Sequence, residues 1–373
     1  MAGIYFHIPY CKQACHYCDF HFSTQRKNEG SMLAAMHKEL LQFKDYFGNE
    51  EVESIYFGGG SPSHVASIFI QGLIEKAREL FRVSDKAEIT LEANPDDMSK
   101  NNLKDWLNMG INRLSVGIQS FNDRDLTWMN RAHDSDQALQ CMYEAQEQGF
   151  SNLSLDLIYG IPDQSLNEWK KNLELAIQCG VQHISAYCLT IESNTAFGKR
   201  KTKGELTEKS DEKTTTELRL LQDMLRDAGF EQYEISNFAQ NGFYAKHNTS
   251  YWLNKAYLGI GPSAHSYKND KREWNISNNN LYIKQSENGA VLREYELLSD
   301  KEKYNELILT GLRTKWGISL KEIQSKFEID IENVFQDELE KYADSITIDN
   351  GYLKLKQNGI PIADRIAVDF FMA

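Results

Sequence analysis

The chain has 373 residues, of which 41% are hydrophobic and 25% are charged, as in an ordinary globular protein. Lys plus Arg number 41 against 54 Asp plus Glu, and the formal net charge of −13 argues against a general binder of nucleic acid or membrane surfaces. No apolar run reaches the roughly 18 residues of a membrane helix. The short apolar start, interrupted by His7 and Pro9, is unlike a signal peptide. We therefore expect a cytoplasmic protein with one large domain and one smaller domain.

Short β-rich runs alternate with longer amphipathic stretches from residue 3 to residue 228. We expect strands at residues 3–9, 54–57, 88–93, 113–118, 153–159 and 183–191. Helices are expected at about 31–47, 64–81, 99–109 and 208–228, and two others end at Gly149 and Gly180. Six such units with right-handed crossovers predict an α/β fold, a parallel sheet curled into a partial (β/α)6 barrel with a lateral gap.

Three cysteines, Cys11, Cys15 and Cys18, follow the first predicted strand in a CxxxCxxC spacing. Thiolates repeated every third or fourth residue on one loop can converge on a single metal centre, and iron–sulfur clusters are held by such runs. A zinc site is the alternative, and it needs a fourth ligand to complete its tetrahedron. The neighbouring histidines that offer one are His7, His16 and His21. The spacing favours an iron–sulfur cluster and leaves zinc open.

Polar and glycine-rich groups end the next predicted strands. Gly58-Gly59-Gly60-Ser61-Pro62 follows the second strand, and Glu92, Gln119 and Asp156 end the third, fourth and fifth. The carboxyl ends of the strands meet at one mouth of such a barrel. A glycine run alone is often only a turn, and a carboxylate at a strand end is often only solvated. All these groups, together with the cysteines, predict one site.

The CxxxCxYC run, the GGGxPS turn and the six βα units resemble the radical S-adenosylmethionine (radical SAM) superfamily. Within it, residues 92–95, 114–121 and 156–162 are similar to relatives of oxygen-independent coproporphyrinogen III oxidase, and the resemblance extends over essentially the whole chain. It implies that Cys11, Cys15 and Cys18 bind three irons of a 4Fe–4S cluster. The fourth iron would then chelate the methionine end of SAM.

The resemblance also implies a set of SAM-binding residues. Gly59, Gly60 and Ser61 would contact the methionine end, which backbone groups approach closely where side chains are missing. Arg131 would hold the carboxylate and Asp156 the ribose hydroxyls. The remaining residues that would face or flank SAM are Tyr5, Tyr17, Glu92, Gln119 and Cys188.

Two departures from the oxidase pattern indicate a subfamily. The oxidase carries another cysteine two residues after the third ligand, whereas this chain reads Cys18-Asp19-Phe20, and only ten residues precede Cys11. Both features resemble the HemW-type heme chaperones. Coproporphyrinogen decarboxylation, or a radical SAM reaction on a non-porphyrin substrate, remains the alternative function.

His247-Asn248-Thr249-Ser250-Tyr251-Trp252 matches the HNxxYW motif of those chaperones. The resemblance implies that His247 ligates heme iron and that Tyr251 and Trp252 pack on the porphyrin. A core histidine among packed aromatic rings is the alternative on composition alone. His265 is the second candidate ligand.

The same resemblance implies several partners for the chain. They are heme, a heme-acceptor protein, an electron donor such as a flavodoxin or ferredoxin, and a second copy of the chain in a homodimer. No nucleic acid or membrane anchor is expected. The basic run from Lys199 to Lys203 is expected to be a solvated loop.

The end of the chain predicts a separate small domain. Helical periodicity over 301–312, 320–327 and 331–342 precedes strands at 345–348 and 352–356, which flank a hairpin turn at Asp349-Asn350-Gly351. Helices followed by a hairpin indicate a winged-helix-like domain, and without a basic stripe it would serve as a cover or interaction module. The expected divisions are a radical SAM core over 1–236, a connecting segment with the HNxxYW motif over 237–296 and this domain over 297–373.

Overall fold

Six parallel strands stand in chain order at the centre of the sheet, as the sequence predicts. Along the first of them, Ile4, Phe6 and Ile8 are fully buried, while Tyr5 and His7 point to the opposite, concave face. The alternation gives the sheet an apolar side beneath the helices and a second side for a site. The computed structural model describes residues 2–372, and its central strands are β1 (Ala2–Ile8), β2 (Val52–Gly59), β3 (Val83–Ala93), β4 (Arg113–Gln119), β5 (Leu153–Tyr159) and β6 (His183–Cys188).

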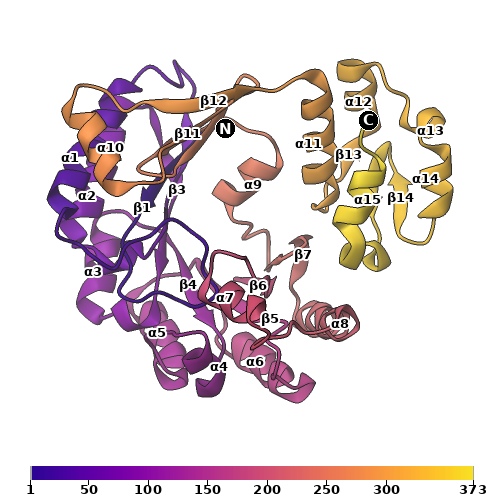
Figure 1. Cartoon of the computed structure of the whole chain (residues 1–373), viewed down its shortest axis with the longest axis horizontal. Coiled ribbons are helices and arrows are strands. Elements are labelled where there is room, and N and C mark those ends of the chain that lie inside the picture. Colours follow the sequence, from indigo (N-terminus) through magenta and orange to yellow (C-terminus); the bar gives the residue numbers. More distant parts are fainter. Residues whose placement is uncertain (1, 373) are drawn as a thin grey trace.

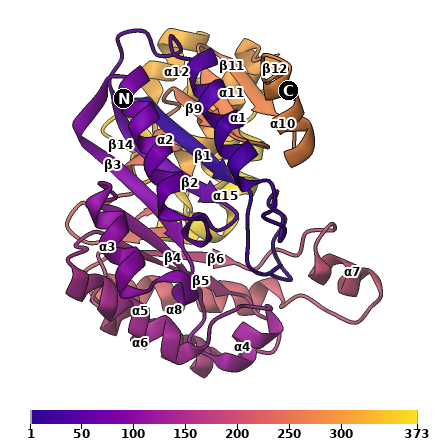
Figure 2. The same cartoon turned by 90° about the vertical axis from the view of Figure 1, so that its left-hand side faces the viewer.

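Amphipathic helices cover the convex side of this sheet (Figures 1 and 2). Helix α5 begins at a capping box formed by Asp134 and Gln137 and ends at Gly149, whose φ of 109° is left-handed. The sequence therefore specifies both ends of this helix locally. The covering helices are α1 (Glu29–Gln42), α2 (Ser67–Leu80), α3 (Lys100–Asn108), α5 (Ser135–Gln148), α6 (Leu166–Gln178) and α8 (Asp211–Asp227).

Shorter helical elements follow the carboxyl ends of four strands. They are η1 (Pro62–His64), η2 (Pro95–Asp97), α4 (Asp123–Trp128) and α7 (Ala196–Thr202). The prediction of a loop over 199–203 is wrong in part, because α7 covers most of that run. The Thr195 hydroxyl caps α7 by accepting from the Gly198 N–H. Figure 2 shows α7 standing out from the rest of the molecule.

The segment after α8 extends the sheet at both edges. Strands β7 (Glu231–Glu234) and β8 (Asn237–Ala239) lie beyond β6, and β9 (Tyr257–Ile260), β10 (His265–Lys268), β11 (Lys271–Asn275) and β12 (Arg293–Leu297) lie beyond β1. The resulting order is β12-β11-β10-β9-β1-β2-β3-β4-β5-β6-β8-β7, so the barrel stays open. These strands of three to five residues gave no sequence signal. The division at residue 236 stays a prediction, although β9 to β12 share the sheet of the core.

A buried carboxylate fastens this extension to the first helix of the core. Glu39 on α1 has no exposed surface, and its carboxylate lies 2.6 Å from Arg293 Nη2 on β12. It also accepts hydrogen bonds from Tyr282 on α10 (Asn279–Glu287) and from Asn275 on β11. A buried charge with a partner and several donors is satisfied, whereas loss of one partner would leave it costly.

Helix α9 (Lys246–Trp252) lies inside the curve of the sheet, against β1 and β2 (Figure 1). It carries the HNxxYW motif. The His247 ring packs against those of Tyr5 and Tyr56, with centroid distances of 6.3 and 5.1 Å. Its backbone N–H donates to Glu88 on β3. The helix thus divides the concave face into two parts.

The predicted C-terminal domain of helices and a hairpin is confirmed, with its own apolar core. The predicted helix over 331–342 is wrong in one respect, because Phe335 separates it into two pieces. Arg313 pairs with Glu234 on β7 and lies over the Trp252 ring, which docks the domain on the core. No helix among the described residues is long and apolar enough to span a membrane. The elements are α11 (Asp300–Leu312), β13 (Ile318–Ser319), α12 (Leu320–Phe327), α13 (Ile331–Val334), α14 (Gln336–Lys341), β14 (Ile346–Asp349), β15 (Tyr352–Leu355), η3 (Gln357–Ile362) and α15 (Ala363–Asp369).

Candidate functional site

Strand register places polar side chains in rows across the concave face. Glu92 on β3 pairs with Ser115 on β4, and Asp156 on β5 pairs with Ser185 on β6. Partners in register point to the same face of a sheet. Polar residues at alternate positions of otherwise apolar strands were the available sequence signal for Ser115 and Ser185, which our sequence interpretation missed.

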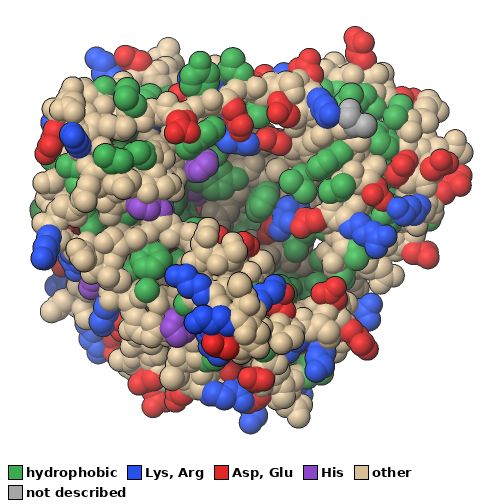
Figure 3. Space-filling view, viewed as in Figure 1, with side chains coloured by type: hydrophobic (Ala, Val, Ile, Leu, Met, Phe, Trp, Pro, Cys, Tyr) green, Lys and Arg blue, Asp and Glu red, His purple; other side chains and the backbone are tan. Residues whose placement is uncertain are grey.

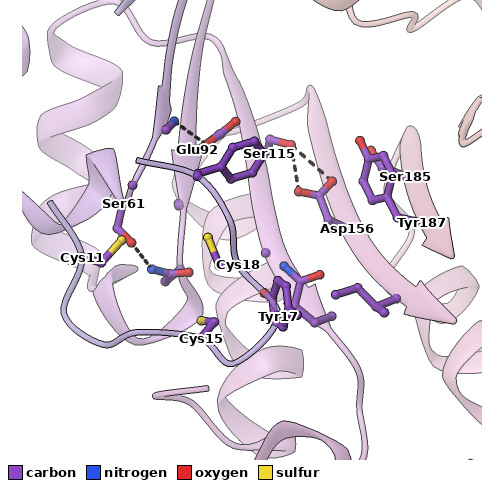
Figure 4. A pocket seen from close by; sticks show the side chains of 18 of the residues that line it. Cys11, Cys15, Tyr17, Cys18, Ser61, Glu92, Ser115, Asp156, Ser185 and Tyr187 are labelled. Carbon is purple, nitrogen blue, oxygen red and sulfur yellow. Dashed lines mark hydrogen bonds between the residues drawn. The ribbon is translucent and has the colours of Figure 1, made fainter. Parts of the chain in front are cut away.

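A cavity of about 380 Å³, here called the cysteine cavity, opens at the carboxyl ends of β1 to β6 (Figure 4). The loop after β1 carries the three cysteines to its wall, and they lie near the row of Glu92, Ser115 and Asp156. The structure brings most of the predicted cluster and SAM residues together here. These are Cys11, Cys15, Tyr17, Cys18, Gly59, Gly60, Ser61, Glu92, Gln119, Arg131, Asp156 and Cys188.

The glycine turn after β2 is bonded to the cysteine loop. The Gly60 N–H donates to the Ile8 carbonyl at 2.8 Å, and the Ser61 N–H donates to the Tyr10 carbonyl at 2.7 Å. A Cβ on Gly60 would lie 2.7 Å from both of those carbonyl oxygens. At Gly60 the missing side chain therefore lets two backbone segments pack together, and the contact of Gly60 with SAM stays a prediction.

The cysteine side chains are half-buried and free of disulfides. Burial raises the pKa of Cys11 to about 11 and that of Cys18 to about 12, so at neutral pH both carry a proton that a metal would displace. Within residues 2–372, no three His, Cys, Asp or Glu side chains gather around one point as ligands of a single ion. A 4Fe–4S cubane gives each thiolate its own iron, and three cysteines on one cavity wall fit that chemistry.

Arg131 lies at the centre of the hydrogen bonds around the cysteines. Its Nη2 donates to Asn94 Oδ1 at 2.7 Å and to the Gly117 carbonyl at 2.6 Å, and its Nη1 lies 3.3 Å from Cys15 Sγ. Its buried Nε has no partner among the described residues. A guanidinium with one unused donor fits a ligand carboxylate. Asn94, which also donates to Ser61 Oγ, is a site residue that sequence reasoning did not single out.

Two carboxyl groups in the cysteine cavity have shifted pKa values. Burial raises the pKa of Glu92 to about 7, although hydrogen bonds from Tyr56 Oη at 2.7 Å and the Gly59 N–H favour its charged form. Burial likewise raises the pKa of Asp156 to about 6, against hydrogen bonds from Ser115 and Ser185. Such groups can accept hydrogen bonds from hydroxyls and pair with a cation, both of which SAM offers.

A second cavity of about 700 Å³, here called the tyrosine cavity, lies beyond β1 on the same concave side. Figure 3 shows a hollow on this face with hydrophobic side chains inside it and histidines beside it. Asp19 and Phe20 line both cavities. The structure places Tyr5 in this cavity, away from the cysteine cavity where it was predicted to flank SAM. The other aromatic and histidine side chains that line it are His7, Phe20, His21, Tyr251, Trp252, Tyr257, His265 and Tyr267.

His247 lines neither cavity and is only 1% exposed. Its Nδ1 is hydrogen-bonded to Ser54 Oγ at 2.8 Å and its Nε2 to Tyr251 Oη at 2.7 Å. Burial lowers the pKa of His247 to about 3, so the ring is neutral. In this structure no ring nitrogen is free for iron. Its assignment as the heme ligand stays a prediction.

Comparisons with known proteins agree with this fold. The radical SAM superfamily profile matches residues 5–176, and that of the HemN C-terminal domain matches residues 298–362. The solved structure of coproporphyrinogen III oxidase (HemN) from Escherichia coli has a similar fold, with a TM-score of 0.84 and 21% identity over 100% of this chain and 90% of that chain. Fold, profile and cysteine spacing define a radical SAM protein.

Curated relatives narrow this class. The heme chaperone HemW of Bacillus subtilis is 33% identical over 94% of this chain and 93% of its own length. HemW of Lactococcus lactis is 32% identical over 90% of this chain and 87% of its own. The chain belongs to the HemW family of the radical SAM superfamily.

Proposed function

We propose that the chain is a heme chaperone: it binds heme and passes it to an acceptor protein, and it carries a 4Fe–4S cluster and SAM in the cysteine cavity. The observation that carries this proposal is the pair of neighbouring cavities that share Asp19 and Phe20 as a wall. One holds the three cysteines, and the other is lined by aromatic rings and histidines. Family membership supports the same function, because the relatives named above are heme chaperones.

The cysteine cavity supplies groups for the carboxylate, the amino group and the ribose hydroxyls of SAM. Arg131 would hold the carboxylate through its unused Nε, and Glu92 would accept a hydrogen bond from the amino group. Asp156 would accept hydrogen bonds from the ribose hydroxyls. When bound, the cluster and SAM supply one-electron chemistry. The chain's own residues orient the ligand.

The proposed partners follow from this chemistry. The cluster needs an electron donor, for which a flavodoxin or ferredoxin is suited, and the heme needs an acceptor protein that lacks it. We place the protein in the cytoplasm, where its six free cysteines would stay reduced. A homodimer stays a prediction that no described contact addresses.

Coproporphyrinogen decarboxylation is the competing function, since the fold is also that of HemN. Phe20 stands where the oxidase pattern has a further cysteine. It is 66% exposed and lines both cavities. A large apolar ring at this position supports a protein that packs against a porphyrin. It does not support the oxidase interpretation, in which a fourth thiol stands here.

One anaerobic reconstitution separates the two functions. The protein is loaded with iron, sulfide, SAM and hemin and then mixed with a heme-free cytochrome, and heme transfer is followed by the Soret band of the acceptor after separation. A second sample receives coproporphyrinogen in place of hemin, and its products are separated and quantified. Hemin binding and transfer without protoporphyrinogen would support the chaperone. Protoporphyrinogen formation without heme transfer would overturn it.

A further inference from the structure

We propose that the tyrosine cavity is the heme site and that His265, not His247, provides the nitrogen for the iron. This inference rests on the proposed function and specifies where in the molecule heme binds. Volume, ring lining, histidine bonding and charge each contribute to it independently.

The walls of the tyrosine cavity suit a flat aromatic ligand. Tyr257 on β9 and Tyr267 on β10 are partners in the sheet, so their rings share one face. The Tyr251 ring lies 4.5 Å from that of Tyr257 at 76°. A volume of about 700 Å³ lies within the range of small-molecule pockets. These rings form a continuous wall on which a porphyrin face can pack.

Three histidines line this cavity, and they differ in how many of their ring nitrogens are hydrogen-bonded. His7 uses Nδ1 for Tyr5 Oη at 3.2 Å and Nε2 for the His21 carbonyl at 2.8 Å. His21 uses Nε2 for Asn279 Oδ1 at 2.7 Å, which leaves only Nδ1 without a hydrogen bond to a described residue. The ring of His265 makes no hydrogen bond to any residue of 2–372, and the side chain is exposed. Both of its nitrogens are therefore available without breaking a contact.

The position of His265 is set by its strand. It lies two residues before Tyr267 on β10, so both side chains point to the same side. Its register partner is Trp274 on β11, and the two rings are stacked at 6.0 Å and 27°. An imidazole supported by an indole is pre-positioned at the cavity, whereas His247 is held beneath Tyr251.

Propionate groups need a cation, and the chain is acidic. Arg272 lines the cavity, but Glu296 and Glu306 already engage its guanidinium. Lys255 also lines it, and its Nζ has no hydrogen bond or ion pair with any described residue. Lys255 is therefore the group we assign to a propionate.

The decisive experiment is a hemin titration of the full-length chain, followed by the Soret band and by the spin state of the iron. We expect His265→Ala to shift the band and weaken binding on the order of tenfold or more, because it removes a ligand bond. His37→Ala, on the outer helix α1 and outside both cavities, is the matched histidine control and should bind as wild type. His247→Gln should keep the wild-type iron spectrum. A wild-type spectrum and affinity in His265→Ala, or loss of the ligand signature in His247→Gln alone, would overturn the proposal.

A second variant tests the cavity independently of the ligand. Lys255→Glu should weaken hemin binding more than Lys255→Gln, because it adds repulsion to the loss of a cation. Both variants should bind mesoporphyrin dimethyl ester, which lacks free propionates, as well as wild type does. Equal hemin affinity in all three proteins would remove Lys255 from the site. If the wild type itself does not bind hemin, the proposed function is wrong. If the wild type binds hemin but its affinity does not change in the His265 and Lys255 variants, only the proposed site is wrong.

Discussion

The Nδ1 atom of His247 lies 2.8 Å from the Ser54 hydroxyl, and this contact anchors α9 inside the concave face of the sheet. The first strand makes room for it, because a Cβ on Gly3 would come within 2.9 Å of Ser54 Oγ and 3.0 Å of the His247 ring. On either side of the anchor, Asn248 faces the cysteine cavity and Tyr251 faces the tyrosine cavity. One short helix thus forms part of both cavities.

Loss of this anchor should destabilise the protein. Ser54→Ala would leave a buried imidazole nitrogen without its partner, which costs about 1–3 kcal/mol in the free energy of unfolding. The measurement is urea unfolding of the metal-free protein. Ser151→Ala, which changes an exposed serine before β5, is the control and should be neutral. Equal stability of Ser54→Ala and wild type would show that the contact does not hold α9.

Acid should weaken the fold through the same residue. Burial lowers the pKa of His247 from 6.5 to about 3, so between these values the unfolded chain binds a proton that the folded chain does not. Stability is therefore complete above pH 6.5 and decreases as the pH falls toward about 3. The slope of unfolding free energy against pH should be smaller in His247→Gln. An identical slope would assign the acid sensitivity to other groups.

The cysteine loop should hold one 4Fe–4S cluster. Each of three variants should abolish it: Cys11→Ala, Cys15→Ala and Cys18→Ala. Each substitution leaves one of the three irons without its protein ligand. Iron and acid-labile sulfide are counted per chain after anaerobic reconstitution. Cys179→Ala, at the buried end of α6, is the matched control and should keep both. Stoichiometric zinc without sulfide in the wild type would contradict the cluster.

Gly60→Val should affect the cluster and SAM binding together. The new side chain would collide with the Ile8 and Tyr10 carbonyls that hold the cysteine loop. Cluster content and SAM affinity, by equilibrium dialysis, should therefore both fall. A variant with a full cluster and weak SAM binding would contradict this prediction and show that the side chain acts on the ligand alone.

SAM affinity should depend on pH near neutrality. Burial raises the pKa of Glu92 to about 7, and its charged form accepts a hydrogen bond from the amino group of SAM more strongly than its neutral form does. Affinity should be complete above about pH 7 and fall by up to about tenfold per pH unit below it. Glu92→Gln should bind SAM weakly at every pH and flatten the profile. A group with this pKa titrates between about pH 6 and pH 8. If the SAM affinity of the wild type were constant over that range, Glu92 would be excluded from the contact.

Local sequence determined the repeating core and the loop that carries the cysteines. The six strands were predictable because buried apolar runs such as Leu153–Tyr159 alternate with amphipathic helices, whose ends are marked by residues such as Gly149. The cysteine spacing is likewise a property of one short loop. This spacing can be recognised without knowledge of any distant contact.

Only the tertiary structure decided what surrounds that core. Strands β9 to β12 are too short to show a period, and they form because they pair with β1 and with one another and are fastened by the buried Glu39. The same holds for the motif of α9. Its spacing resembles a ligand motif, but the burial of His247 depends on a hydrogen bond to Ser54, which lies 193 positions away in the chain. Burial and long-range hydrogen bonding are collective properties of the packed chain, and so it was the fold that separated the histidine held in the core from the histidine free at the cavity.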